Sequence, residues 1–263
     1  MIGLFVVIPA LHLGLQFSGI LGANALAVMP YVIWTGTGLL AGVRSLVAAR
    51  RAHRRAQQIA WVWFGSGAIA WSIGVGFELI SLYWVDLFEI LIGTRRSFYL
   101  FYPVTLVAGL FILASSRSRS LSILNLANIG VIGAAMLACA ILILLEPVLK
   151  TKESAAYVVF SIVDLTSLFT ATIVALHLLW FKGSREIRGV VLLLALSASV
   201  HAAANIGFYV DQFQLGSYES NLDVFWVFAL LLHYWAAHEQ DASTEPVIAA
   251  SQTGWIERSA GAA

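Results

Sequence analysis

The stretch from Arg50 to Trp84 constrains this chain most, because it indicates both a depth in a membrane and a direction. It begins with four arginines within Arg50–Arg55, here called the Arg50–Arg55 cluster, and an apolar run from Ile59 to Ser81 follows whose first charged residue is Glu78. At 1.5 Å per residue, such a run is about long enough to cross the hydrocarbon core of a bilayer. Lys/Arg clusters beside a span stay in the cytoplasm. The run is therefore predicted to start there, with Glu78 near its outer end.

Composition supports a membrane protein with several spans. Hydrophobic residues make up 60% of the chain and charged residues only 11%, against an ordinary charged fraction of about 25%. A soluble core has no use for so much apolar surface. The net charge of +1 gives no indication of a nucleic-acid partner, and the single Cys139 excludes an intrachain disulfide framework and a multi-cysteine metal site.

We predict an all-α, polytopic membrane helix bundle with about eight transmembrane helices. Lipid offers the backbone no hydrogen-bond partners, so every crossing has to be helical. A seven-span alternative has the first segment dip into the membrane or lie along its surface. The predicted spans cover residues 2–21, 25–48, 59–81, 97–114, 124–146, 155–181, 187–209 and 222–238.

The loops predict the orientation. With the Arg50–Arg55 cluster inside, ten Lys and Arg residues fall at inner loops and four at outer loops, which places both termini in the cytoplasm. Residues 1–240 are expected to form one transmembrane domain, and the polar, small-residue-rich segment 241–263 is expected to be a disordered cytoplasmic tail.

Residues near the span ends refine these depths. Trp61 and Trp63 are predicted to mark the inner interface of the third span, as aromatic belts do. The outer segment 82–96 has apolar residues in pairs four positions apart, which suits a short amphipathic helix on the membrane face, with a plain loop as the alternative.

Spans three and four resemble spans seven and eight, which predicts a parallel repeat about an axis normal to the membrane. Both leading spans carry small residues four positions apart. Such stripes allow helix backbones to approach closely in lipid. The predicted helix-packing residues are Ser66, Ala70, Gly74, Ser199, Ala203 and Gly207.

Several short motifs occur in the order expected of a known group. They are Arg54-Arg55, Trp71-Ser72-Ile73-Gly74 followed by Glu78, Phe101-Tyr102-Pro103, and Phe160 to Asp164. With these motifs the chain resembles the seven- or eight-helix membrane sensor region found before bacterial diguanylate cyclases and sensor kinases. It departs from that group at Val75, where an Asp is usual, and we expect no output domain after span eight. The resemblance implies a sensing module of the bacterial inner membrane.

Ionisable and polar residues within the spans are the candidate site, because they are costly in lipid and default to a functional hypothesis. His201, Asn205 and Tyr209 follow one another four positions apart and share one helix face. We predict a pocket open to the periplasm, and the alternative is a purely structural pairing of Asp164 with His201 or Asn205. The pocket candidates are Glu78, Asp164, His201, Asn205, Tyr209 and Asp223.

Other chemistries find less support in the residues. His12 and His201 match in depth and are the candidate haem ligands, with core histidines as the alternative. No mid-span lysine is present for a retinal Schiff base, and no His-Glu-x-x-His run for a metalloprotease. The sequence requires no cofactor and suggests no catalytic residue.

The function expected from these features is a non-enzymatic sensory or partner-binding module. Its partners would be the lipid bilayer and a cytoplasmic signalling protein or a larger membrane complex. The basic inner loops would contact anionic lipid or such a partner, and the alternative is that they set the topology alone. The alternatives are a small-molecule transporter, a membrane enzyme acting on a lipid-soluble substrate, and a haem- or pigment-binding subunit.

Overall fold

The structure, a computed structural model, describes residues 2–17, 23–81, 83, 85–115, 123–150, 154–180, 187–215 and 223–241. Every regular element within these residues is a helix. The helix of residues 224–241, here called the last helix, follows α7. The labelled helices are α1 (Ile2–Phe17), α2 (Ala23–Arg51), α3 (Arg55–Ser81), α4 (Val85–Ser115), α5 (Ile123–Lys150), α6 (Ala155–Trp180) and α7 (Arg188–Leu215).

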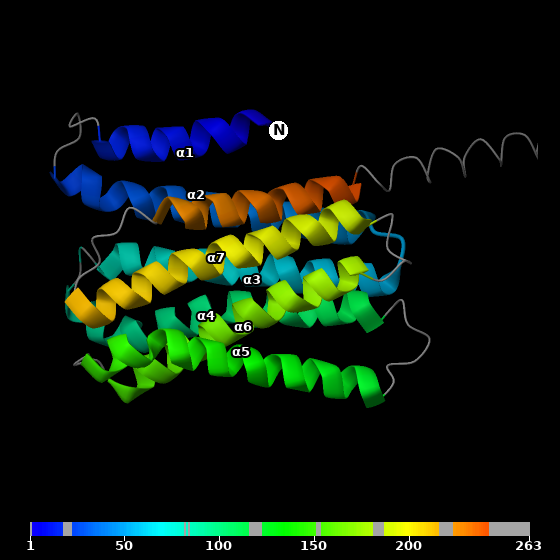
Figure 1. Cartoon of the computed structure of the whole chain (residues 1–263). Coiled ribbons are helices and arrows are strands. Elements are labelled where there is room, and N and C mark those ends of the chain that lie inside the picture. Colours follow the sequence, from blue (N-terminus) through cyan, green and yellow to red (C-terminus); the bar gives the residue numbers. More distant parts are fainter. Residues whose placement is uncertain are drawn as a thin grey trace, which may run out of the picture.

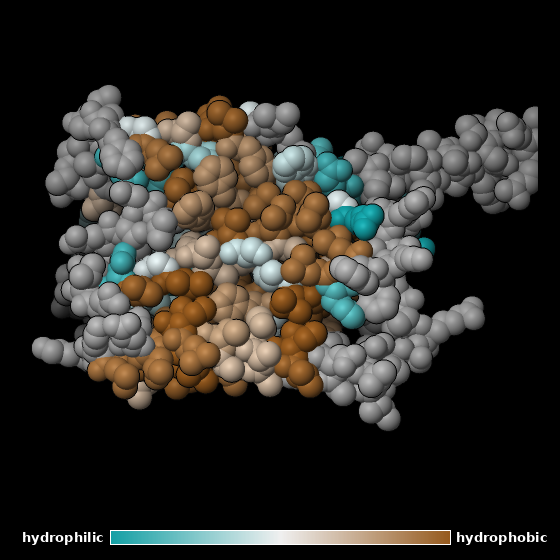
Figure 2. Space-filling model, viewed as in Figure 1, coloured by the Kyte–Doolittle hydropathy of each residue, from teal (hydrophilic) through white to brown (hydrophobic). Residues whose placement is uncertain are grey.

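The helices have the length and surface of a polytopic membrane protein. Two apolar helical segments, Gly3–Gln16 and Val131–Leu145, are shorter than the five long segments named at the end of this paragraph. Figure 2 shows hydrophobic side chains gathered over the middle of one face, with hydrophilic ones toward both ends of the helices. Five segments among the described residues are long and apolar enough to cross a membrane: Ala27–Arg51, Arg55–Ser81, Arg96–Ala114, Ala155–Leu179 and Arg188–Phe213.

The helices lie side by side, with α1 and α5 at opposite edges of the view in Figure 1. α3 packs against α2 and α4, and α6 packs against α4, α5 and α7. The last helix, orange in Figure 1, joins two of these helices: its Ala229 carbonyl accepts a hydrogen bond from Ser197 of α7 (2.8 Å), and its His233 bonds Ser45 of α2 (3.0 Å). The end of the described chain is therefore built into the bundle.

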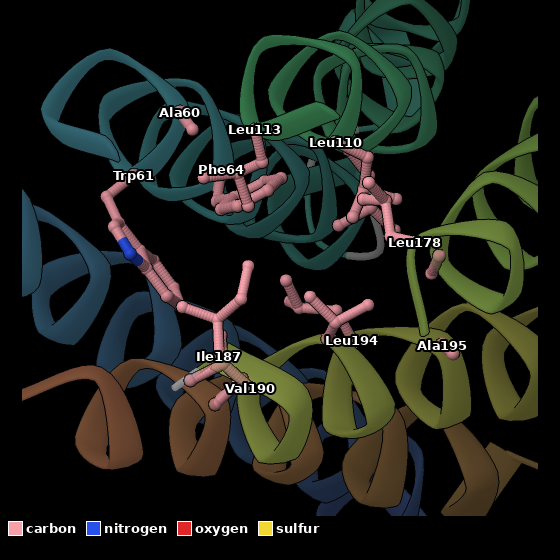
Figure 3. Close-up of a cluster of buried hydrophobic side chains, with 14 of the residues drawn as sticks. Ala60, Trp61, Phe64, Leu110, Leu113, Leu178, Ile187, Val190, Leu194 and Ala195 are labelled. Atoms are coloured by element: carbon pink, nitrogen blue, oxygen red, sulfur yellow. The ribbon is translucent and has the colours of Figure 1, made fainter. Parts of the chain in front are cut away.

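Three clusters of buried hydrophobic side chains join the helices. The first lies near the Arg50–Arg55 cluster, and in Figure 3 Trp61 and Phe64 of α3 converge with Leu110 of α4 and Leu194 of α7. The second is rich in tryptophan and lies on parts of α2 and α3 that are farther from the Arg50–Arg55 cluster. The third joins α5 to α6 and α7. Lipid tails are as apolar as these side chains, so close packing rather than the hydrophobic effect holds the clusters together.

Helices α2 and α3 pack closely together at a pair of glycines. A Cβ atom added to Gly65 would lie 2.9 Å from the carbonyl oxygen of Gly42 and 3.0 Å from Cδ2 of Leu46. A Cβ atom on Gly42 would likewise lie 3.0 Å from the Gly65 carbonyl oxygen. Small residues let helix backbones make extensive dispersion contact in lipid. The α2–α3 contact therefore depends on having no side chain at either position.

The predicted packing stripe of α3 is partly a contact face. A Cβ atom on Gly74 would lie 3.0 Å from the ring of Tyr99, so Gly74 packs against α4. Ala70 is 8% exposed. Ser66 is only half-buried, and its hydroxyl bonds the carbonyl of Trp63 in its own helix (3.0 Å).

The predicted packing stripe of α7 includes a contact with α6, since Oγ of Ser199 lies 3.4 Å from Oγ1 of Thr172, but most of it is open. Ser199 and Ala203 are exposed and Gly207 is half-buried, whereas His201 and Asn205 are buried. A helix that is apolar on all sides tolerates small residues toward lipid as well as toward protein, because both surroundings are apolar. The stripe therefore does not identify the contact face. The predicted repeat stays a prediction, although α3 packs on α4 and α7 bonds the last helix.

Three other expectations differ from the structure. Trp61, predicted for the interface, is fully buried, while Trp63 is 38% exposed. Residues 85–92 are helical but belong to α4, which runs without a break from Val85 to Ser115 rather than forming a separate surface helix. The last helix extends to residue 241, past the predicted end of span eight, and residues 242–263 of the predicted tail lie outside the described residues.

Candidate functional site

A cavity of about 230 Å³ lies among α2, α3, α4, α6, α7 and the last helix. It lies toward the end of the bundle opposite the Arg50–Arg55 cluster, since Glu78 lines it near the far end of α3. Of the sixteen described residues that line it, nine are Phe, Tyr or Trp, so this wall is largely aromatic. The polar residues of the wall are Glu78, Arg96, Asp164, His201, Asn205 and Gln212.

Most of the residues predicted to form a pocket meet at this cavity. Asp223, the sixth candidate, is not among its lining residues. Asp223 lies at the start of the last helix, and its Oδ2 is 3.4 Å from Nε2 of His12 in α1. The five candidates that line the cavity are Glu78, Asp164, His201, Asn205 and Tyr209.

Asp164 of α6 is the centre of a buried hydrogen-bond network. Its Oδ2 accepts a hydrogen bond from Nδ2 of Asn205 (2.5 Å) and another from Oη of Tyr209 (2.8 Å). Asn205 and Tyr209 are four residues apart on α7, so one helix face supplies both donors. Asp164 as a whole is only 3% exposed, and buried polar groups need such partners. Asp164 thereby joins α6 to α7.

The network continues into the last helix. Oδ1 of Asn205 accepts a hydrogen bond from Nε1 of Trp226 (2.6 Å). Asn205 therefore uses both ends of its amide, one toward α6 and one toward the last helix. Trp226 in turn packs edge-on against Trp34 of α2, with ring centroids 5.0 Å apart. Four helices are thus connected around the cavity wall.

Two other charged residues among those described at the cavity wall lie on α3 and α4. Oη of Tyr99 donates a hydrogen bond to Oε2 of Glu78. The guanidinium carbon of Arg96 lies 4.2 Å from the ring centroid of Tyr157, which is cation–π geometry. The wall therefore combines two carboxyl groups with one cation that already rests on an aromatic face.

His201 of α7 lies among aromatic rings. Its ring centroid is 5.8 Å from that of Trp71 and 5.1 Å from that of Tyr102, and its buried Nδ1 has no hydrogen-bond partner within the described part of the chain. Of the two structural pairings predicted for Asp164, the one with Asn205 is formed, and the described residues show no hydrogen bond between Asp164 and His201. Haem ligation by His12 and His201 stays a prediction. Among the described residues, no group of three or more His, Cys, Asp or Glu side chains could hold a metal ion.

Sequence reasoning missed a second network, deeper in the bundle. The Ser45 hydroxyl donates to the Ala41 carbonyl (2.8 Å), so it accepts from Nε2 of His233 (3.0 Å). Nδ1 of His233 is then the acceptor for Oη of Tyr102, at 3.1 Å. His233 is fully buried. The signal in the sequence was a mid-span histidine, but its partners on α2 and α4 are 188 and 131 residues away.

Tyr102→Phe should lower the free energy of unfolding by about 1 kcal/mol, because a buried hydrogen bond contributes roughly this much to stability. Hydrogen bonds between membrane helices contribute somewhat less on average. The change removes the donor to His233 and leaves the ring in place. Titration with a denaturing detergent would measure the loss. Tyr83→Phe is the control, since Tyr83 is 64% exposed and should change stability little. Equal stability of both variants would show that the Tyr102 hydroxyl contributes nothing.

A charged cluster lies at the opposite end of the last helix. Oδ2 of Asp241 is 2.5 Å from Nη2 of Arg44 and 3.2 Å from Nη1 of Arg51, and Arg44 also lies 3.1 Å from Nδ1 of His238. These contacts join the ends of α2 and the last helix beside the Arg50–Arg55 cluster. The two arginines were predicted only as markers of orientation, and the acid that pairs with them was assigned to the tail.

A scan against protein-family models found no match to this chain, and neither a search of curated proteins nor a search of solved structures found one.

Proposed function

We propose that this protein is an integral membrane sensory or partner-binding module that takes a small ligand into the cavity between Glu78 and Asp164. The observation that carries the proposal is the meeting of polar residues from α3, α6 and α7 at one aromatic-walled cavity. Concave sites with an apolar wall and a few convergent polar groups are typical of small-molecule binding.

The predicted topology indicates on which side of the membrane the cavity opens. With eight spans and both termini in the cytoplasm, the cavity opens in the periplasmic half of a bacterial inner membrane. The support is the excess of Lys and Arg at the Arg50–Arg55 end, which retains that end in the cytoplasm. A ligand would then arrive from the periplasm, as the resemblance to membrane sensor regions implies.

The last helix is the element best placed to carry a signal. It contacts the cavity through Trp226, the middle of the bundle through His233, and the basic end through Asp241. A ligand that competes for Asn205 or Asp164 would weaken the Trp226 contact at one end. The resulting shift between two packings of the helix would alter the Asp241 contacts at the other end. A cytoplasmic partner bound near the Arg50–Arg55 cluster would respond to the change in the Asp241 contacts.

A thermal-shift screen of a small-molecule fragment set on protein in lipid nanodiscs tests the proposal. We expect a subset of compounds to raise the Tm of the wild type but not of Asp164→Asn, which alters the carboxyl group at the cavity. Ser167→Ala on the same helix is the control, since its hydroxyl bonds the Val163 carbonyl (2.8 Å). Compounds that shift all three proteins equally, or none, would refute a ligand site at Asp164. Uptake of a binding compound into liposomes would identify a transporter instead.

A further inference from the structure

We propose that the cavity binds a small organic cation, a molecule whose ammonium group lies among the aromatic rings and faces Asp164. This inference rests on the proposed function and names the ligand class for the same cavity. Ammonium groups are attracted to the negative faces of aromatic rings, and most strongly to tryptophan. Three of the lining residues are tryptophans: Trp34, Trp71 and Trp226.

The charges of the wall favour a cation over an anion. Among the described residues that line the cavity, Glu78 and Asp164 contribute two carboxyl groups and Arg96 contributes one guanidinium group. Arg96 is itself placed over the ring of Tyr157 at 4.2 Å. An aromatic face of this wall therefore already accommodates a positive charge, supplied by the protein.

Asp164 retains an oxygen for a ligand. Both of its hydrogen bonds within the described chain end on Oδ2, from Asn205 and Tyr209. These two bonds hold the carboxyl plane in place, and Oδ1 remains as the acceptor for an additional donor. A carboxyl group fixed in this way is preorganised for an ammonium group and needs no rearrangement of α7 to receive it.

The size of the space limits the molecule. The cavity has a volume of about 230 Å³, larger than the cavity of about 150 Å³ known to hold one benzene molecule. It therefore suits a compact molecule of roughly ten non-hydrogen atoms, scaled from benzene. A trimethylammonium or arylalkyl ammonium compound has this size.

The test compares molecules of one shape that differ in charge. Choline, its neutral analogue 3,3-dimethylbutanol and the anion 3,3-dimethylbutanoate would be titrated against the protein in nanodiscs, with phenethylammonium as a second cation. The tryptophans of the wall provide a fluorescence signal. We expect at least one cation to bind roughly tenfold or more tightly than the neutral analogue.

Two variants separate charge recognition from a general loss of fold. Asp164→Asn should bring the cation affinity close to that of the neutral analogue. Arg96→Gln removes a like charge from the wall, so it should strengthen cation binding by about threefold or more. A merely structural role of either residue predicts no such opposite effects. Ser167→Ala should leave the affinity for the cation and the affinity for the neutral analogue unchanged.

The outcomes distinguish the two proposals. Binding of the neutral or anionic analogue as tightly as the cations would overturn the organic-cation class, and its loss in Asp164→Asn would still support a ligand site there. Failure of every cation to bind would overturn the class as well. If the fragment screen on the same preparation also finds no Asp164-dependent compound, the proposed ligand-binding function is refuted as well.

Discussion

Asp164→Ala should destabilise the bundle by about 2 kcal/mol, because it removes the acceptor of two interhelical hydrogen bonds and leaves two buried donors without partners. The orphaned groups are Nδ2 of Asn205 and Oη of Tyr209. Water replaces these partners poorly, since both residues are at most 7% exposed. Unfolding in a denaturing detergent, followed by the loss of helical circular dichroism, would measure the change.

Two related variants should lose less stability than Asp164→Ala. Tyr209→Phe removes one of the two bonds while leaving Asp164 bonded to Asn205, so it should cost about half as much. Asp164→Asn keeps the size of the side chain and one acceptor oxygen and should also cost less than the alanine variant. Wild-type stability in Asp164→Ala would mean that the network does not hold α6 against α7 and that its residues serve binding alone.

Gly65→Ala should destabilise the protein by about 2 kcal/mol, within the range measured for overpacked cores, and Gly65→Leu should prevent the native packing of α2 on α3. The added Cβ atom would meet the Gly42 carbonyl oxygen at 2.9 Å. That oxygen belongs to a helix backbone, which has no rotamer through which to move away. The two helices would have to separate, and the dispersion contacts along both would be lost.

Gly76→Ala provides the control on the same helix. Apart from the backbone of its own helix, no atom of the described residues lies within 4 Å of a Cβ added at Gly76, so the substitution meets open space there. Alanine is a better helix former than glycine by up to about 1 kcal/mol, and Gly76→Ala should be neutral or stabilising. If Gly65→Ala behaves like Gly76→Ala, the close α2–α3 approach is not a feature of the folded protein.

Apolar run length predicted the helical class and most of the helices without reference to tertiary structure. The predicted span 59–81 lies within α3 (Arg55–Ser81), and 155–181 nearly matches α6 (Ala155–Trp180). The reason is local: a long apolar run in lipid has to satisfy its own backbone hydrogen bonds. The polar residues of the site were also identifiable in the sequence, because Asp164 stands out within an apolar span.

The sequence alone determined that this chain is helical, apolar and marked by a few polar groups inside its spans. Only the tertiary structure decided that Asp164 bonds Tyr209 rather than His201, that Asp223 lies beside His12, and that Trp61 is buried. In a soluble helix, polar residues mark the outer face, but a helix in lipid is apolar on all sides and carries no such mark. Which face meets protein, and which distant partner meets a buried polar group, then depends on how the whole bundle packs.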